Sequence, residues 1–444
     1  MLLITINNKI TILGTNLALV YKARGIIMFE KHTLPNGLRI VAEPMESVRS
    51  VTVGIWIKSG SRFENLSQQG ISHLLEHMLF KGTDSRTAQD IAEEIDSIGG
   101  HINAFTSKEY TCIYIKVIDS HFETALAILA DMFFNSKFDQ EDLEKEKQVI
   151  FEELKMYEDT PDEYVHDLLI QSCYGEHELA HNILGDRESV SNLSSEALIN
   201  HHKRYFTPEK TVISVSGNVS MDNVVETATK YFGSFVNINN NDNHPLRGPS
   251  YYTDSIVKGK DTEQVHFCLA FPGLSVENSQ LYHLGLLNNI LGGSMSSKFF
   301  QEIREKRGLC YSVYSYYLNF TDSGLFVIYA GFSQDNFNET YDLIWSILDE
   351  IKQGSITDEE LNRSKEQVKG NILMGLESTS NRMARLGRDE LLKGEILTYE
   401  QIIEKIENIT KEDLLKLAQD LFQKNQMSSA VIGPMSEEEV HSIV

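Results

Sequence analysis

Cysteine is scarce in this sequence, and the few that occur exclude two kinds of architecture. Cys112, Cys173, Cys268 and Cys310 are spread over 444 residues without a Cys-x-x-Cys pair. A disulfide framework, or a zinc ion held by cysteines, needs cysteines at short and regular spacings. The sequence predicts neither. We therefore expect a reducing compartment, the cytoplasm, in which each thiol is a small buried apolar group.

Long apolar runs are also absent. A membrane-spanning helix needs about 20 consecutive apolar residues, and no stretch reaches that length, so membrane insertion is not expected. Residues 1–27 are mildly apolar, but Asn and Thr interrupt them and no A-x-A cleavage site follows, which argues against a signal peptide. A clear strand-and-turn pattern begins after Met28. We treat residues 1–27 as an N-terminal extension of uncertain status.

Positive charge is in short supply. The chain has 40 Lys and Arg residues against 64 Asp and Glu residues, and its formal net charge at pH 7 is -24. Nucleic acids and anionic membranes bind basic surfaces, so neither is expected as a partner. The 41% hydrophobic and 23% charged content is that of a globular protein, and the length allows two or three domains.

The second half of the chain repeats the first. Residues 193–206 (LSSEALINHHKRYF) match residues 409–422 (ITKEDLLKLAQDLF), each 216 positions further on, and the strand after each ends in Gly217 or Gly433. The Asn-rich tract between the halves lacks periodicity and is typical of a linker. We therefore predict two similar α+β domains. The expected ranges are 28–236 for the first domain, 237–247 for the linker and 248–444 for the second domain.

The residues best suited to chemistry lie in the stretch ISHLLEHMLFK, residues 71–81. His73, Glu76 and His77 stand at i, i+3 and i+4, so they share one face of an α-helix. Two imidazoles at this spacing can bind one tetrahedral zinc ion, and the carboxylate between them can take a proton from water at the open position. HxxEH is the inverted form of a zinc-protease helix. The alternative is a chance pattern among 14 histidines.

A third ligand is expected on the helix predicted over residues 139–156. Glu146, Ile150 and Glu153 stand at i, i+4 and i+7, so both carboxylates point towards the apolar stripe that contains Ile150. Glu152 is turned by about 100° from Glu153, because a helix has 3.6 residues per turn. The spacing favours Glu153 as the ligand and Glu146 as its neighbour, without deciding between them.

The second domain provides an internal comparison. Glu64 in the first half corresponds to Glu277 in the second. The same offset places Leu286, Asn289 and Ile290 at the positions that correspond to His73, Glu76 and His77. A polar cluster that only stabilised the fold would be expected in both copies. Its presence in one copy favours a functional role.

These residues together resemble a known family. His73-Leu-Leu-Glu76-His77, followed by Val-Ile-Phe-Glu-Glu153, resembles the inverted-motif zinc peptidases of the pitrilysin/insulinase superfamily. Bacterial members similar to the β-subunit of mitochondrial processing peptidase are the nearest match, over residues 28–444. The resemblance implies one Zn²⁺ bound by His73, His77 and Glu153, with Glu76 as the general base. It also implies that Glu146 orients the ligands.

The resemblance extends to substrate binding. The stretch GHINAFT resembles the family's edge strand, to which a peptide substrate adds as an extra strand through Asn103, Ala104 and Phe105. Glu163 and Asp167, one helical turn apart, align with acidic positions that bind arginine ahead of the cleaved bond. A solvated acidic face is the alternative for this pair.

The implied fold and activity follow. The fold is α+β, with two homologous domains that form a clamshell, each a mainly antiparallel sheet covered by helices on one face. Arg304 and Tyr311, in REKRGLCY, resemble a pair that reaches the substrate and the developing oxyanion from the second domain. We expect a homodimeric zinc endopeptidase that cleaves extended or unfolded peptides, including presequence-like peptides with a basic residue near the cleavage site. The alternative is a non-catalytic scaffold or core subunit of the same fold, although such members typically lack a ligand or the base.

Overall fold

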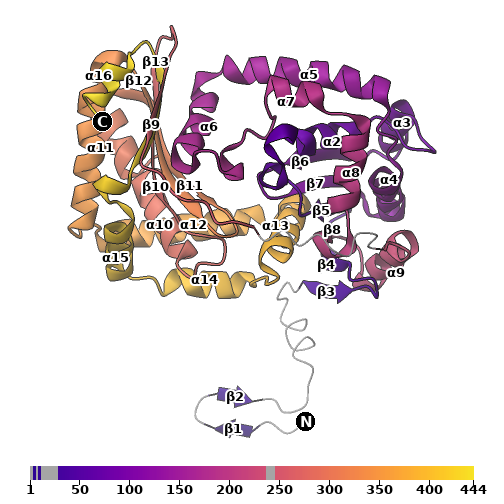
Figure 1. Ribbon diagram of the computed structural model, residues 1–444. Helices are drawn as coiled ribbons and strands as arrows, with labels where there is room; N and C mark the ends of the chain where they lie inside the picture. The colour runs from indigo at the N-terminus through magenta and orange to yellow at the C-terminus, as the bar shows by residue number, and fades with distance from the viewer. Residues whose placement is uncertain (1–3, 7–8, 12–28, 237–245) are drawn as a thin grey trace.

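The computed structural model describes residues 4–6, 9–11, 29–236 and 246–444 (Figure 1). None of the helices in these ranges is long and apolar enough to cross a membrane. The predicted linker lies almost wholly outside them. Of the N-terminal extension, only β1 (Ile4–Ile6) and β2 (Lys9–Thr11) are described, as an antiparallel pair.

The first half of the chain forms a six-stranded sheet in the order β3-β4-β8-β5-β7-β6. Neighbouring strands are antiparallel except for β4 and β8, which are parallel. The turn at residues 35–37 joins β3 to β4, with Gly37 at a φ of 93°. The strands are β3 (Glu30–Thr33), β4 (Arg39–Pro44), β5 (Ser50–Ile57), β6 (His101–Thr106), β7 (Thr111–Ile118) and β8 (Thr211–Gly217).

The second half repeats this sheet with one strand fewer, in the order β11-β12-β10-β13-β9. Only β13 and β9 are parallel, as β8 and β4 are in the first sheet. The predicted two-domain α+β fold with mainly antiparallel sheets is therefore confirmed. The strands are β9 (Ser255–Gly259), β10 (Val265–Pro272), β11 (Cys310–Asn319), β12 (Gly324–Phe332) and β13 (Ser428–Gly433).

Most helices pack on one face of the sheet formed by their own half (Figure 1). In the first half these are α2 (Ile71–Leu79), α3 (Ala88–Ser97), α4 (Phe122–Asn135), α5 (Gln140–Glu158), α7 (Arg187–Asn192), α8 (Ser195–Tyr205) and α9 (Met221–Phe232). In the second half they are α10 (Leu281–Leu291), α11 (Phe337–Lys352), α12 (Asp358–Gly375), α14 (Tyr399–Glu407), α15 (Lys411–Leu421) and α16 (Glu437–His441).

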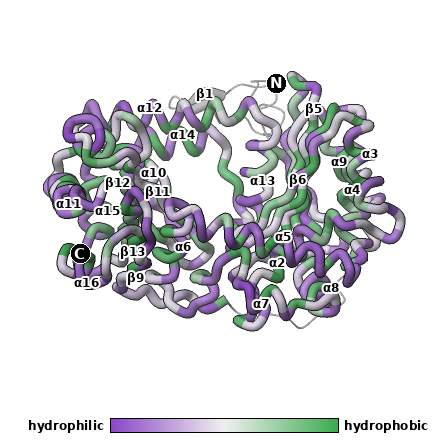
Figure 2. The backbone as a smooth tube through the Cα atoms, turned by 90° about the horizontal axis from the view of Figure 1, so that it is seen from above, coloured by the Kyte–Doolittle hydropathy of each residue, from purple (hydrophilic) through white to green (hydrophobic). Residues whose placement is uncertain are grey.

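Two further helices are exchanged between the halves. α13 (Thr379–Lys393) packs on the first sheet, whereas α6 (Pro161–Tyr174) packs on the second. Both lie between the two sheets in Figure 2. The expectation that each sheet is covered on one face only was incomplete, because Trp56 and Val212 make the second face of the first sheet apolar as well. That face must also be removed from water.

A buried ion-pair network joins the two halves. Arg62 donates to Glu109, at 2.7 Å, and to Asp322, at 2.6 Å. Glu109 also accepts hydrogen bonds from the backbone N–H and the hydroxyl of Thr321. Glu109 lies in the turn between β6 and β7, and Thr321 and Asp322 lie in the turn between β11 and β12. The network therefore ties the edge hairpin of one sheet to that of the other.

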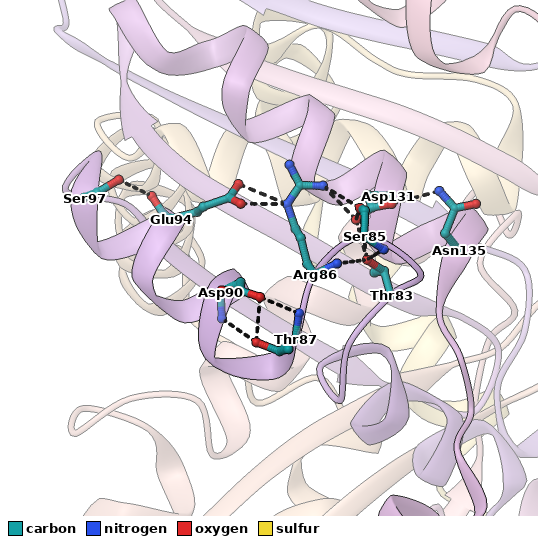
Figure 3. Close-up of polar contacts among 9 residues, drawn as sticks. All are labelled: Thr83, Ser85, Arg86, Thr87, Asp90, Glu94, Ser97, Asp131 and Asn135. Atoms are coloured by element: carbon teal, nitrogen blue, oxygen red, sulfur yellow. Dashed lines mark hydrogen bonds and ion pairs between the residues drawn. The ribbon is translucent and has the colours of Figure 1, made fainter.

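The chain that leaves α2 is held by a second network (Figure 3). Arg86 donates from Nε to Glu94 on α3, at 3.0 Å, and from Nη1 to Asp131 on α4, at 2.7 Å. Thr83 donates to the same Asp131 oxygen. Thr87 caps the N-terminus of α3. These contacts fix the C-terminal end of the helix that carries the HxxEH motif.

Candidate active site

The N-terminus of α2 is built around a buried carboxylate. Glu64 accepts hydrogen bonds from the backbone N–H groups of Gly70 and Ser72, both at 2.8 Å. Gly70 has a φ of 85°, a left-handed conformation that glycine adopts at little cost. Burial raises the pKa of Glu64 to about 7, and the backbone donors oppose that rise. Glu64 thus satisfies helix donors that would otherwise have no partner.

The predicted ligands converge on one spot. The candidate ligand atoms of His73, His77 and Glu153 all lie within 4.8 Å of one another. The Nε2 atom of His73 is 4.0 Å from Glu153 Oε2, and the Nε2 atom of His77 is 3.9 Å from Glu153 Oε1. α2 supplies the two histidines, and α5, which packs against it, supplies the carboxylate.

Glu146 contacts one of the candidate ligands, His77. Its Oε2 atom is 3.0 Å from His77 Nδ1, and its Oε1 atom is 2.6 Å from Lys81 Nζ. The Nδ1–H of His77 therefore donates to Glu146, which leaves the Nε2 lone pair free to bind a metal. Nδ1 of His73 is buried without a hydrogen-bond partner among the described residues. Burial and, to a smaller extent, the nearby His77 lower the pKa of His73 to about 3, so the ring is neutral.

Glu76 and the two histidines share a face of α2, and Glu76 and His73 open into a common pocket of about 420 Å³. Thr106 on β6 donates a hydrogen bond of 2.5 Å to Glu76 Oε2. Burial raises the pKa of Glu76, the Thr106 hydroxyl and His77 lower it, and Glu153 raises it. The pocket is also lined by Ala104 and Phe105, so the carboxylate faces the edge of the first sheet.

β6 is the edge strand at which the resemblance places the substrate. It pairs with β7 on one side only. The backbone N–H of Ala104 donates to the side chain of Asn103, at 2.8 Å, in an exposed position. The ring of Phe105 is 37% exposed and packs edge-on against Trp56. An added strand would therefore meet an unpaired edge directly beside Glu76.

The two acidic residues on α6 are placed differently. Asp167 lines the pocket of His73 and Glu76, and its Oδ2 atom accepts a hydrogen bond of 2.6 Å from Asn182. Glu163 is exposed and does not line that pocket. In this conformation, only one member of the predicted arginine-binding pair faces the site.

Arg304 and Tyr311 are brought together, but away from the cluster. The guanidinium of Arg304 lies 5.5 Å from the centre of the Tyr311 ring, which is 74% exposed. Arg304 lies in the last turn of a short π-helix (Phe300–Glu305), and Tyr311 lies on the edge strand β11. Neither residue lines the pocket of His73 and Glu76.

The sequence did not predict five residues of this pocket, namely Thr106, Tyr157, Asn182, Ile183 and Leu184. Thr106 stands three positions after Asn103 in the predicted edge strand, and that proximity was the available signal. Asn182 follows α6 in an irregular segment, for which no periodicity exists. The internal comparison is unchanged by the structure, since Leu286 and Ile290 are buried apolar residues on α10.

The donor set fits a zinc ion. Two imidazole nitrogens and one carboxylate oxygen are common zinc ligands, with bond lengths of about 2.0–2.2 Å. Tetrahedral bonds of that length separate neighbouring ligand atoms by roughly 3.3 Å. The observed separations of 3.9 and 4.0 Å between Glu153 and the two histidines exceed that value by less than 1 Å.

Comparisons with known proteins identify the family of this chain. Residues 39–187 match the model of the insulinase family (peptidase family M16), and residues 192–368 match that of the peptidase M16 inactive domain. A Bacillus subtilis protein named as an uncharacterized zinc protease is 46% identical over 92% of this chain and 98% of its own length. A Streptomyces coelicolor protein of the same description is 37% identical over 95% of this chain and 93% of its own length.

Solved structures share the fold. A protease from Helicobacter pylori has a TM-score of 0.86 at 24% identity, covering 92% of this chain and 100% of its own. A Pseudomonas fluorescens structure described as a peptidase M16 inactive domain has the same TM-score at 19% identity, covering 92% and 98%. On the strength of the family models and the relatives that match almost its whole length, the chain belongs to the insulinase family, peptidase family M16.

Proposed function

We propose that this protein is a zinc-dependent endopeptidase that cleaves extended or unfolded peptides. One observation carries the proposal: His73, His77 and Glu153 converge around a carboxylate, Glu76, in a pocket that opens beside an unpaired strand edge. The names of its relatives, which are described as zinc proteases, support the same activity.

The edge of β6 binds the substrate backbone. A peptide that adds as a further strand forms main-chain hydrogen bonds, which tolerate many sequences. Its backbone competes with the Asn103 side chain for the N–H of Ala104. Phe105 and Ala104 then lie next to the substrate side chains that enter the pocket.

Glu76 acts as the general base and then as the general acid. Zinc bound by the two histidines and Glu153 would act as a Lewis acid that polarises the scissile carbonyl and acidifies a water molecule. Glu76 accepts the proton of the attacking water and later delivers it to the leaving amine. The hydroxyl of Thr106 holds one oxygen of Glu76, which orients the other towards the pocket.

The second domain completes the site. Arg304 and Tyr311 lie outside the pocket, so their proposed contact with the substrate requires the halves to close. Asp167 supports a preference for a basic residue near the cleaved bond, and the strongly negative net charge of the chain is consistent with it. We further propose a homodimer that works in the cytoplasm, where the four buried free cysteines stay reduced.

The replacement Glu76→Gln tests this proposal. General-base catalysis contributes about 10²–10⁴-fold, so kcat/KM on an unfolded protein or peptide should fall by that factor while zinc content stays unchanged. Glu93→Gln, an exposed carboxylate on α3, is the matched control and should cleave normally. A Glu76→Gln protein that keeps its zinc and cleaves at the wild-type rate would contradict the mechanism.

The same preparation tests the alternative of a non-catalytic scaffold. A scaffold would cleave none of the peptides, and a chelator would change nothing in the assay. Cleavage that is lost with a chelator and restored by added zinc excludes it.

A further inference from the structure

Two stretches of chain that are far apart in the sequence line the pocket of His73 and Glu76. One is the edge strand β6, which contributes residues 104–106, and the other is residues 182–184, which lie after α6. We call residues 182–184 the loop wall. A peptide strand that adds to β6 enters this pocket, so the distance between β6 and the loop wall determines which chains fit.

Lys108 connects these two stretches. It lies in the turn that joins β6 to β7, and its ammonium group donates a hydrogen bond to the backbone carbonyl of His181, the residue directly before the loop wall. Lys108 is 9% exposed and does not line the pocket. It can therefore act on a bound peptide only through the residues that it holds.

The backbone of Lys108 is itself fixed. Its carbonyl accepts a hydrogen bond of 2.8 Å from the N–H of Arg62, whose side chain belongs to the buried network between the two hairpins. The N–H of Ser61 donates to the carbonyl of Ser107. Gly60 approaches the same turn so closely that a Cβ atom there would overlap the carbonyl oxygens of Ser107 and Lys108. The ammonium group therefore extends from a rigid turn.

The loop wall has further attachments on its other side. Asn182 donates to Asp167, at 2.6 Å, and its side-chain oxygen accepts a hydrogen bond of 2.8 Å from the N–H of Leu184. Gly185 then packs against the start of α2, where a Cβ atom would overlap the carbonyl oxygen of Gln69. The segment is thus held by α6 and α2 on one side, and the bond of Lys108 links it to the hairpin of β6.

The charges around Lys108 favour a cation at this position. Burial lowers the pKa of Lys108, and the carboxylates of Asp167 and Glu64 oppose that fall. Glu64 accepts the backbone donors at the N-terminus of α2, and Asp167 lines the pocket. A neutral side chain in place of Lys108 would leave both carboxylates without this attraction and the carbonyl of His181 without this donor.

We propose that Lys108 is a positioning residue for the peptidase reaction, because it holds the loop wall at a set distance from the edge of β6. The groove between them then accepts one extended strand of the substrate. Without the ammonium group, the loop wall moves away from β6 and contacts the bound peptide less. This inference rests on the proposed function, since it assumes a peptide at the edge of β6.

Replacing Lys108 by Met tests the inference, because Met has a similar length but neither the charge nor the donor. A group that improves the binding of substrate and transition state equally changes KM and leaves kcat unchanged. We therefore expect KM for an unfolded peptide to rise about tenfold, with kcat within about twofold of the wild type and zinc content unchanged. In the Glu76→Gln background, Kd for the same peptide, measured by fluorescence anisotropy, should rise by the same factor.

Hydrogen exchange followed by mass spectrometry measures the loop wall directly. A fragment that covers residues 180–187 should exchange faster in Lys108→Met than in the wild type. If Lys108→Met does not fold, Lys108→Gln takes its place, since its shorter neutral side chain stays polar, and the same changes are expected.

Lys365→Met is the matched control. Lys365 is 8% exposed and donates to the backbone carbonyl of Glu407, at 2.7 Å, within the second half. Its loss should lower the urea midpoint, as the loss of Lys108 does, but leave KM, Kd and the exchange of residues 180–187 unchanged.

Three results would overturn the inference. They are wild-type values of KM and Kd in Lys108→Met, unchanged exchange over residues 180–187, and an equal rise of KM in Lys108→Met and Lys365→Met. A wild-type protein that neither binds nor cleaves any peptide would refute the proposed function instead, so the two failures are distinguishable.

Discussion

Replacing Arg62 by Met should destabilise the protein far more than replacing an arginine in an exposed ion pair, because the ion pairs of Arg62 are buried. The Arg62 side chain is 1% exposed and binds Glu109, Asp322 and the backbone carbonyl of Arg247. Removing one partner of a buried pair costs about 3–5 kcal/mol, because the remaining charge stays in a medium of low polarity. Glu109, whose side chain is 3% exposed, keeps only the two donors of Thr321. The carboxylate of Asp322 reaches solvent and adds little to the cost.

Arg49→Met is the matched control. Arg49 also pairs with a carboxylate, Asp119, at 2.9 Å, but its side chain is 86% exposed, so its loss should change the stability little. Urea unfolding followed by circular dichroism measures both variants. Arg62→Met should lower the midpoint far more than Arg49→Met. Equal shifts would refute the reasoning, since they would mean that burial between the two hairpins does not set the energy of the pair.

Three further predictions concern the ligand shell, the exchanged helix and acid stability. Glu146→Gln should weaken zinc binding about 10–100-fold in a competition titration, because His77 loses its charged partner, whereas the exposed Glu144→Gln should not. Gly387→Ala should destabilise the protein by about 1–3 kcal/mol in thermal unfolding, since the new Cβ would lie 2.2 Å from the indole nitrogen of Trp56. Gly370→Ala is the comparison, because its Cβ would meet no atom within 4 Å, and it should stabilise the protein by about 0.5–1 kcal/mol. Burial lowers the pKa of His201 to about 3, so this group does not reduce stability above pH 6.5 but reduces it increasingly as the pH drops towards 3. The wild-type protein should therefore lose about 2 kcal/mol of stability between pH 6.5 and 5 through this group. His201→Gln should not show that part of the loss when urea unfolding is measured at each pH.

The sequence predicted the duplicated fold because each half repeats the same order of helix and strand signals. The strands that end at Gly217 and Gly433 do occupy matching places, each next to a parallel neighbour. What it could not predict is the exchange of α6 and α13. Each helix carries apolar residues that must be buried, and these residues do not specify which of the two sheets will bury them.

The candidate site, too, could be predicted from the sequence only in part. His73, Glu76 and His77 lie on one helix, so their convergence follows from helical spacing alone. The contacts of the Thr106 hydroxyl with Glu76 and of Asn182 with Asp167 depend on how a strand edge and an irregular segment pack against α2 and α6. Contacts of this kind join residues far apart in the chain and leave no periodic signal. The position of Arg304 and Tyr311 relative to the ligands depends on the closure of the halves, which stays a prediction.

Zinc content tests most directly whether His73, His77 and Glu153 bind the metal, because Glu152 and Glu153 are adjacent carboxylates on α5 with different environments. Glu153 faces His73 and His77, whereas Glu152 is exposed and pairs with Lys155. Elemental analysis after dialysis should find one zinc ion per chain in the wild type and in Glu152→Gln, and much less in Glu153→Gln. If Glu153→Gln retains zinc as the wild type does, or if Glu152→Gln loses it, the account of this site is wrong.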